Sequence, residues 1–165
     1  MIVAVIGSRD LPPEHLQTCR WIGRRLVERG HAIVSGNAPG ADQAYAAGAN
    51  EVRPDAVTLC LPWLTFERHA IHPANRIVVA RLGTDESRRA EAACPRWRSK
   101  TNPQRLLLTR DVMIVDRADN VIAYPWGPGN GTRFTMGLAM DALKQMTDLS
   151  DPGRLAACVR QLTTT

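Results

Sequence analysis

Short runs of branched apolar residues recur along this chain, and glycine, proline or small polar residues follow each run. Apolar runs of roughly four to eight residues are typical of strands that are covered on both faces, as in parallel sheets. The segments between the runs have helical character, with an apolar face before Gly30 and an alanine-rich stretch over 41–49. Alternating strands and helices predict an α/β fold, a Rossmann-like domain with a mainly parallel sheet flanked by helices. The predicted strands cover residues 2–6, 31–34, 56–61 and 121–124.

The length and composition predict one globular unit. With 165 residues, 44% of them hydrophobic, the chain can bury one substantial core and is too short for two. We expect a single domain over 1–165, whose last helix, at about 151–162, packs against the sheet or across a homodimer or higher homo-oligomer. No apolar stretch is long enough to span a bilayer, and the N-terminus lacks the features of a secretory signal. These features predict a cytoplasmic protein with no membrane partner.

The cysteines and histidines indicate neither a metal nor a cofactor. The four cysteines are scattered and form no C-x-x-C pair. His69 and His72 have the spacing of one helix face, but Pro73 follows at once and no further ligand lies at a telling distance along the chain. We therefore expect no metal and no cofactor. Lys and Arg outnumber Asp and Glu by 21 to 16, an excess that favours an anionic partner.

Three of the predicted strands end in loops that are small or rich in glycine. In open parallel sheets, ligands collect beyond the carboxyl ends of the strands, where loops lead into helices. Glycine lets the backbone approach a ligand, and the amides at a helix N-terminus attract an anion, although glycines also end strands for purely structural reasons. The loops therefore predict a phosphate or nucleotide site. Its predicted residues are Gly7, Ser8, Arg9, Ser35, Gly36, Gly40, Gly127, Gly129, Asn130, Gly131, Thr132 and Arg133.

Three segments resemble successive blocks of the SLOG superfamily of Rossmann-like proteins. They are VIGSRD near the N-terminus, IVSGNAPGADQAYAAGA, and TRDVMIVDRADNVIAYPWGPGNGTRFTMGLA. This superfamily includes the DNA-processing protein A family and the Lonely Guy phosphoribohydrolases, and the resemblance covers roughly residues 1–143. It implies a phosphate-binding role for Gly129, Gly131 and Thr132, and it places Arg110 facing the nucleotide crevice.

The sequence departs from the Lonely Guy enzymes where their catalytic glutamates stand, because positions 133–136 here read RFTM. The run N-G-T-x-x-T is closer to the glycine–serine loop of the DNA-processing branch, which binds without N-glycosidic hydrolysis. We therefore expect the chain to bind a nucleotide or a nucleotide-derived ligand. The alternative is a nucleoside-monophosphate N-glycosidase that uses Asp42 or Glu67 as its carboxylate, with Asp10 as a weaker choice. Each of these acids also suits a purely structural role, at a helix start or on the surface.

Two tryptophans follow strand-ending prolines and are the predicted base-stacking residues. Trp63 and Trp126 each come directly after such a proline, which places them near the proposed crevice. An indole stacks on the flat face of any base, and it can equally close the top of a core.

The most basic part of the chain runs from residue 88 to residue 110. Its prolines at 95 and 103 predict a loop, and a basic loop can follow the backbone of single-stranded nucleic acid. Such a run can also be a solvated face or an arm over a dimer partner. The residues predicted to contact nucleic acid are Arg88, Arg89, Arg96, Arg98 and Lys100.

Overall fold

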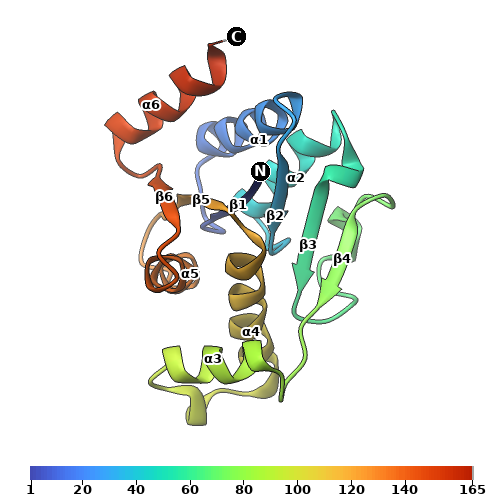
Figure 1. Cartoon of the computed structure of the whole chain (residues 1–165), viewed down its shortest axis with the longest axis vertical. Coiled ribbons are helices and arrows are strands. Elements are labelled where there is room, and N and C mark those ends of the chain that lie inside the picture. Colours follow the sequence, from blue (N-terminus) through green and yellow to red (C-terminus); the bar gives the residue numbers. More distant parts are fainter. Residues whose placement is uncertain (165) are drawn as a thin grey trace.

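The computed structural model describes residues 1–164, which form an all-parallel sheet of six strands with helices on both faces (Figure 1). The strand order is β4-β3-β2-β1-β5-β6, so the chain winds outward from β1 to β4 and then crosses back to β5 on the other side of β1. This reversal makes the carboxyl ends of β1 and β5 the switch point of the sheet. The strands are β1 (Ile2–Gly7), β2 (Ala32–Ser35), β3 (Val57–Leu61), β4 (Arg76–Val79), β5 (Asn120–Tyr124) and β6 (Gln145–Asp148).

The helices form two layers, one on each face of the sheet. The core on one face gathers side chains from α1, α2 and α6, and the core on the other face gathers side chains from α4 and α5. α3 packs on α4 around the buried Trp97, beyond the arrowheads of β3 and β4 in Figure 1. The helices are α1 (Pro13–Glu28), α2 (Ala41–Asn50), α3 (Asp85–Ala93), α4 (Asn102–Arg117), α5 (Gly131–Asp141) and α6 (Pro152–Thr163).

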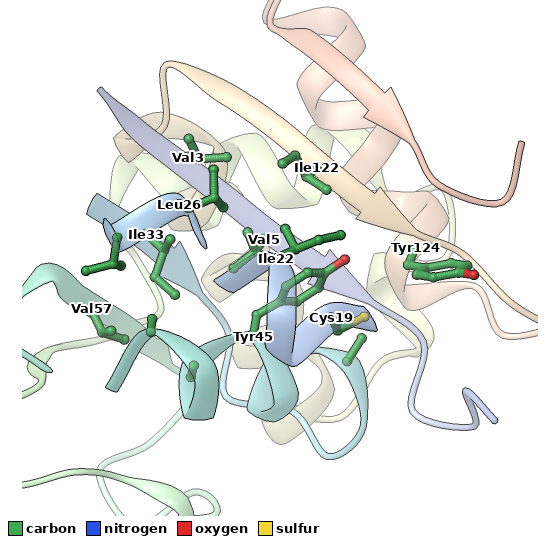
Figure 2. Packing of buried hydrophobic residues seen from close by; sticks show 14 of the residues in the cluster. Val3, Val5, Cys19, Ile22, Leu26, Ile33, Tyr45, Val57, Ile122 and Tyr124 are labelled. Carbon is green, nitrogen blue, oxygen red and sulfur yellow. The ribbon is translucent and has the colours of Figure 1, made fainter. Parts of the chain in front are cut away.

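Glycine sets the close packing of α1 against α2. A Cβ at Gly23 would overlap the backbone of Tyr45, and a Cβ at Gly48 would overlap the backbone of Arg20. Figure 2 shows the side chains that this close approach gathers against the strands, including those of Ile22 and Tyr45. Because α2 is held this tightly, the loop that leads into it has a fixed position at the carboxyl end of β2.

The prediction of a mainly parallel α/β sheet is confirmed, and the structure adds two strands that the sequence analysis did not expect. β4 has a short apolar run over 77–79 but begins with the exposed Arg76, and the mainly polar β6 (QMTD) lacks the apolar run that marks a central strand. α5 stops at Asp141, and Leu143 has a left-handed backbone with φ 54° that turns the chain into β6.

The loop predicted from Pro95 and Pro103 lies between α3 and α4, over 94–101, and the basic residues on either side of it are helical. α3 begins at the N-cap Thr84, and α4 begins with a capping box between Thr101 and Gln104. Pro103 lies in the first turn of α4. A backbone N–H there would have no partner within the helix, so proline is compatible with the start of the helix and does not interrupt it.

The last helix packs against the first core. α6 runs close to the predicted 151–162 and inserts Cys158 and Leu162 among the residues of α1 and β1, and the expected homodimer or higher homo-oligomer stays a prediction. Within residues 1–164, none of the helices combines the length and the apolar character that a bilayer crossing requires.

Candidate functional site

A cavity of about 330 Å³ lies at the carboxyl ends of β1 and β5, at the switch point of the sheet. The start of α5 and the middle of α4 form two of its walls, and the loop after β1 forms its rim. The cavity brings together many of the residues predicted from the sequence, and these are Gly7, Ser8, Arg9, Asp10, Asp42, Arg110, Trp126, Gly129, Gly131 and Thr132. The sequence analysis did not single out Asp111 or Thr135, which also line it.

Asp42 ties the ends of two strands together beneath the cavity. Its carboxylate accepts backbone N–H bonds from Gly7 at 3.1 Å, Gly36 at 3.2 Å and Ala38 at 3.3 Å. Burial raises the pKa of Asp42, and the nearby Arg110 and these backbone donors oppose that rise. Both oxygens are therefore engaged by the protein itself.

The loop that leads into α2 is closed by its own packing. A Cβ at Gly36 would overlap the guanidinium of Arg110. Gly40 has φ 91°, and a Cβ there would lie 2.5 Å from the carbonyl oxygen of Arg9. Ser35 donates its hydroxyl to the Val5 carbonyl at 2.7 Å. The structure thus gives Ser35, Gly36 and Gly40 places in the wall behind the cavity rather than in its lining.

The loop that leads into α5 is open. A Cβ at Gly129 or at Gly131 would meet no atom within 4 Å. The side chain of the N-cap Asn130 makes no capping hydrogen bond, whereas Thr84, Thr101 and Asp151 cap α3, α4 and α6. The first amides of α5 therefore have no side-chain acceptor at the place where the helix meets the cavity.

Arg133 braces this loop from outside the cavity. Its guanidinium Nη1 donates to the carbonyl of Gly127 at 2.9 Å and to that of Gly129 at 2.8 Å. Gly127 takes the left-handed φ of 64° that the turn requires. Gly127, Asn130 and Arg133 thus shape the loop without lining the cavity.

Arg110 and Asp111 bring opposite charges from α4 into the cavity wall, and each is only 6% exposed. The Arg110 Nε donates to the Asp111 carboxylate at 2.8 Å, and its Nη1 donates to the Gly36 carbonyl at 2.5 Å. The guanidinium also lies 5.9 Å from the ring centroid of Phe66. Burial raises the pKa of Asp111 to about 6, although the charge of Arg110 acts in the opposite direction. In the sequence, the position of Asp111 directly after the predicted Arg110 is the signal that could have pointed to it.

Residues 1–80 match the family model of DNA recombination-mediator protein A. Among solved structures, DNA processing protein A from Helicobacter pylori superposes with a TM-score of 0.65 at 19% identity, over 93% of this chain and 73% of that one. That protein is described as binding single-stranded DNA. The Moco carrier protein from Chlamydomonas reinhardtii superposes with a TM-score of 0.61 at 19% identity, over 98% of this chain and 96% of that one.

The chain has an α/β Rossmann-like fold that is similar to the fold of these proteins. A third similar structure is the molybdenum cofactor binding protein from Rippkaea orientalis, with a TM-score of 0.59 at 19% identity, over 89% of this chain and 74% of that one. A comparison with curated proteins found no match. At these identities the likeness is one of fold, and a fold by itself does not fix a function.

The two tryptophans occupy different surroundings in the structure. The Trp126 ring is 41% exposed at the cavity and lies 4.9 Å from the ring of His15, and the Ser8 hydroxyl bonds to both the N–H and the carbonyl of Trp126. Trp63 lies outside the cavity, where it packs edge-on against Phe66 and the first core. Of the predicted stacking pair, the cavity therefore includes Trp126 alone.

Glu67 lies outside the cavity, on the loop after β3. It has a left-handed backbone with φ 46°, and its carboxylate lies 3.6 Å from the Nε2 of His69. Its carbonyl accepts a bond from the side chain of Asn37, so this segment has a structural link to the end of β2. Across residues 1–164, no three His, Cys, Asp or Glu side chains are grouped in a way that could hold a metal ion.

The basic residues of the α3–α4 region divide into two sets. Arg88 and Arg89 on α3 pair with Asp85, and Arg89 also binds Asp116 of α4 at 2.9 Å. Arg96, Arg98 and Lys100 lie between the two helices, and in the described part of the chain none of the three forms an ion pair. Of the five residues predicted to contact nucleic acid, these three therefore have no acidic partner within residues 1–164.

Proposed function

We propose that this chain binds a nucleotide or a nucleotide-derived ligand and holds its phosphate at the start of α5. The observation that carries the proposal is the open glycine loop, where Gly129 and Gly131 meet no protein atom and the helix that follows has no side-chain cap. A helix N-terminus has a partial positive charge and N–H groups that point outward, which suits a phosphate. The Thr132 hydroxyl and the exposed Arg9 at the rim add a neutral and a charged donor.

The size and lining of the cavity support the same proposal. Its volume of about 330 Å³ lies at the lower end of the range of small-molecule sites. Trp126 offers an exposed indole at the mouth, on which a base can stack. The molybdenum cofactor belongs among the ligands to be tested, because two similar structures are described as its carrier and its binding protein.

Binding without turnover fits the cavity better than N-glycosidic hydrolysis. Such hydrolysis needs a carboxylate beside the reacting carbon that can stabilise positive charge or direct a water molecule. Asp42 has both oxygens bonded to backbone N–H groups, and Glu67 lies outside the cavity. Of the other acids that line the cavity, Asp10 is exposed at the rim and Asp111 is paired with Arg110. We therefore assign Asp42 the role of positioning the loops after β1 and β2.

The test is a panel of 5′-nucleotides, the matching nucleosides, and the molybdenum cofactor, followed by thermal unfolding and by assay of released base. A ligand that binds only the folded state raises the melting temperature by mass action, so the nucleotides should raise it and the nucleosides should not. Equal shifts from nucleosides and nucleotides would contradict the phosphate site. Steady release of free base would overturn the binding-only proposal and make Asp10 and Asp111, the other acids that line the cavity, the first residues to mutate.

A second candidate function is the binding of single-stranded DNA by Arg96, Arg98 and Lys100. The observation that favours it is that these three charges have no ion pair and lie beyond the ends of the strands, on the cavity side of the sheet. If they contact a nucleic-acid backbone, affinity for an oligonucleotide should fall steeply with salt, and the triple alanine variant should flatten that slope. Double replacement of the paired Arg88 and Arg89 is the matched control, and it should change the slope less. No oligonucleotide binding at low salt would exclude this candidate.

A further inference from the structure

The cavity has a second polar wall one helical turn beyond the proposed phosphate site. Thr135 follows Gly131 by four residues, so it lies one turn further along the same face of α5. Arg110 and Asp111 line the same cavity from α4, and Thr135 is 3% exposed. A ligand with its phosphate at the start of α5 therefore places its next group against Asp111 and Thr135.

Asp111 is the acid in this wall whose carboxylate keeps free hydrogen-bond acceptor positions. Asp42 receives three backbone N–H bonds, whereas Asp111 receives the Nε of Arg110 on Oδ1 and, within the described residues, no backbone N–H. The Thr135 hydroxyl also hydrogen-bonds to this carboxyl and lowers its pKa, and it lies within reach of the Gly131 carbonyl at 3.1 Å. A carboxylate has about four acceptor positions, so these two side-chain donors do not fill them. Asp111 thus keeps acceptor capacity on the side of the cavity.

We propose that Asp111 accepts a hydrogen bond from a sugar hydroxyl of the ligand, and so selects phosphate esters of ribose over esters that lack those hydroxyls. This inference rests on the proposed phosphate site at the start of α5. A carboxylate repels a phosphate and accepts from a hydroxyl, so Asp111 also orients the ligand with its phosphate toward α5. Dinucleotide-binding domains hold a ribose hydroxyl with a carboxylate by the same chemistry.

The charge of Asp111 makes this selectivity depend on pH. The charged groups around it are Arg110 on α4, Asp42 on α2, and Arg9 and Asp10 on the rim. Because burial raises the pKa of Asp111 to about 6, the carboxyl is charged at pH 7.5 and largely neutral at pH 5. A neutral carboxyl is a weaker acceptor, so the preference for sugar hydroxyls should decline as the pH falls through 6.

The experiment compares the affinity for AMP with that for 2′,3′-dideoxy-AMP by calorimetry, and repeats the comparison with the guanine pair. The wild-type chain should prefer the hydroxylated ligand by about tenfold or more at pH 7.5, since a hydrogen bond to a charged group is lost in the dideoxy analogue. Asp111→Asn should bind the dideoxy ligand at least as well and lose most of the preference. Asp116→Asn, on the same helix and outside the cavity, is the matched control and should behave as wild type.

The outcomes separate this inference from the proposed function. Equal wild-type affinity for both ligands at pH 7.5 would overturn the role of Asp111 and leave the phosphate site standing. Failure of both ligands to bind would overturn both proposals. If Asp111→Asn does not fold, the wild-type chain still decides, because ionisation of the phosphate affects both ligands alike and cancels in their ratio. A preference that is unchanged at pH 5 would then overturn the role of Asp111.

Discussion

Two glycine loops of this chain stand at equivalent places in the sheet and do different things. The loop over 36–40 follows β2 and leads into α2, and the loop over 127–131 follows β5 and leads into α5. In the first loop the glycines make room for other protein groups, the guanidinium of Arg110 and the backbone of Arg9. In the second loop, a Cβ at Gly129 or Gly131 would extend into empty space. The same residue type therefore reflects backbone packing in one loop and, in our proposal, access for a ligand in the other.

The acids beside the two loops show the same contrast. Asp42 lies in the first turn of α2, directly after the closed loop, and its carboxylate accepts three backbone N–H bonds. Asp111 faces the cavity wall of α5 with one strong partner, Arg110. Burial raises the pKa of both acids. What separates them is the supply of backbone N–H groups, which decides whether an acid holds the fold together or is available to a ligand.

Gly40→Ala should show the largest effect, a loss of about 3–5 kcal/mol in the free energy of unfolding. The alanine would have to adopt φ 91° and place its Cβ 2.5 Å from the Arg9 carbonyl oxygen, so the backbone of one loop must move. Chemical denaturation measures the change. A variant as stable as wild type would show that the closed loop tolerates a side chain and would remove the contrast between the two loops.

The pH dependence of stability should distinguish Asp111 from its amide. The pKa of Asp111 is raised from 3.8 to about 6 on folding, so the native state holds the extra proton between these values and stability declines as the pH rises through this window. At 1.36 kcal/mol for each pKa unit, the decline is roughly 3 kcal/mol relative to Asp111→Asn, whose stability lacks this contribution. Denaturation of both proteins from pH 4 to pH 7.5 gives the difference. Parallel curves would contradict the assigned shift.

Gly131→Ala should weaken nucleotide binding by roughly ten- to a hundredfold and leave the stability unchanged or slightly higher. The added methyl meets no protein atom but stands where we place the phosphate, and alanine is a better helix former than glycine. Gly137→Ala is the control, because it lies on the same helix, also meets no atom within 4 Å and does not line the cavity. Affinity and denaturation midpoint are measured on both. Wild-type affinity in Gly131→Ala would place the phosphate elsewhere.

Thr132→Val should show the smallest effect, about a tenfold loss of nucleotide affinity at unchanged stability. Valine keeps the shape of the side chain and removes one hydroxyl donor to a charged acceptor, while the backbone amides of α5 remain. Titration of the same nucleotide against the variant and wild type measures the loss. An unchanged affinity would limit the phosphate contacts to the backbone.

Local residue patterns were enough to predict the central strands and to place the cavity at the carboxyl ends of the strands. Strands β1, β2, β3 and β5 are covered on both faces, so each carries its own apolar run. The loops after β1, β2 and β5 are visible in the sequence as glycine or small residues. Edge strands β4 and β6 have no such requirement. Their pairing depends on a neighbouring strand that is distant in the sequence, and Leu143 gives no local signal that α5 ends beside it.

The tertiary structure decides which residues of the site line the cavity and which pack against other protein groups. The sequence indicated three equivalent loops, but whether a glycine faces a guanidinium, a backbone carbonyl or an open cavity depends on how α2, α4 and α5 pack. Arg110 could be placed near the crevice from its segment of the chain, whereas the burial of Asp111 and its contact with Thr135 arise only when α4 and α5 lie side by side. Sequence patterns report local geometry and burial. Whether a buried acid keeps a free acceptor position depends on the donors around it, and these donors come from parts of the chain that are far apart in the sequence.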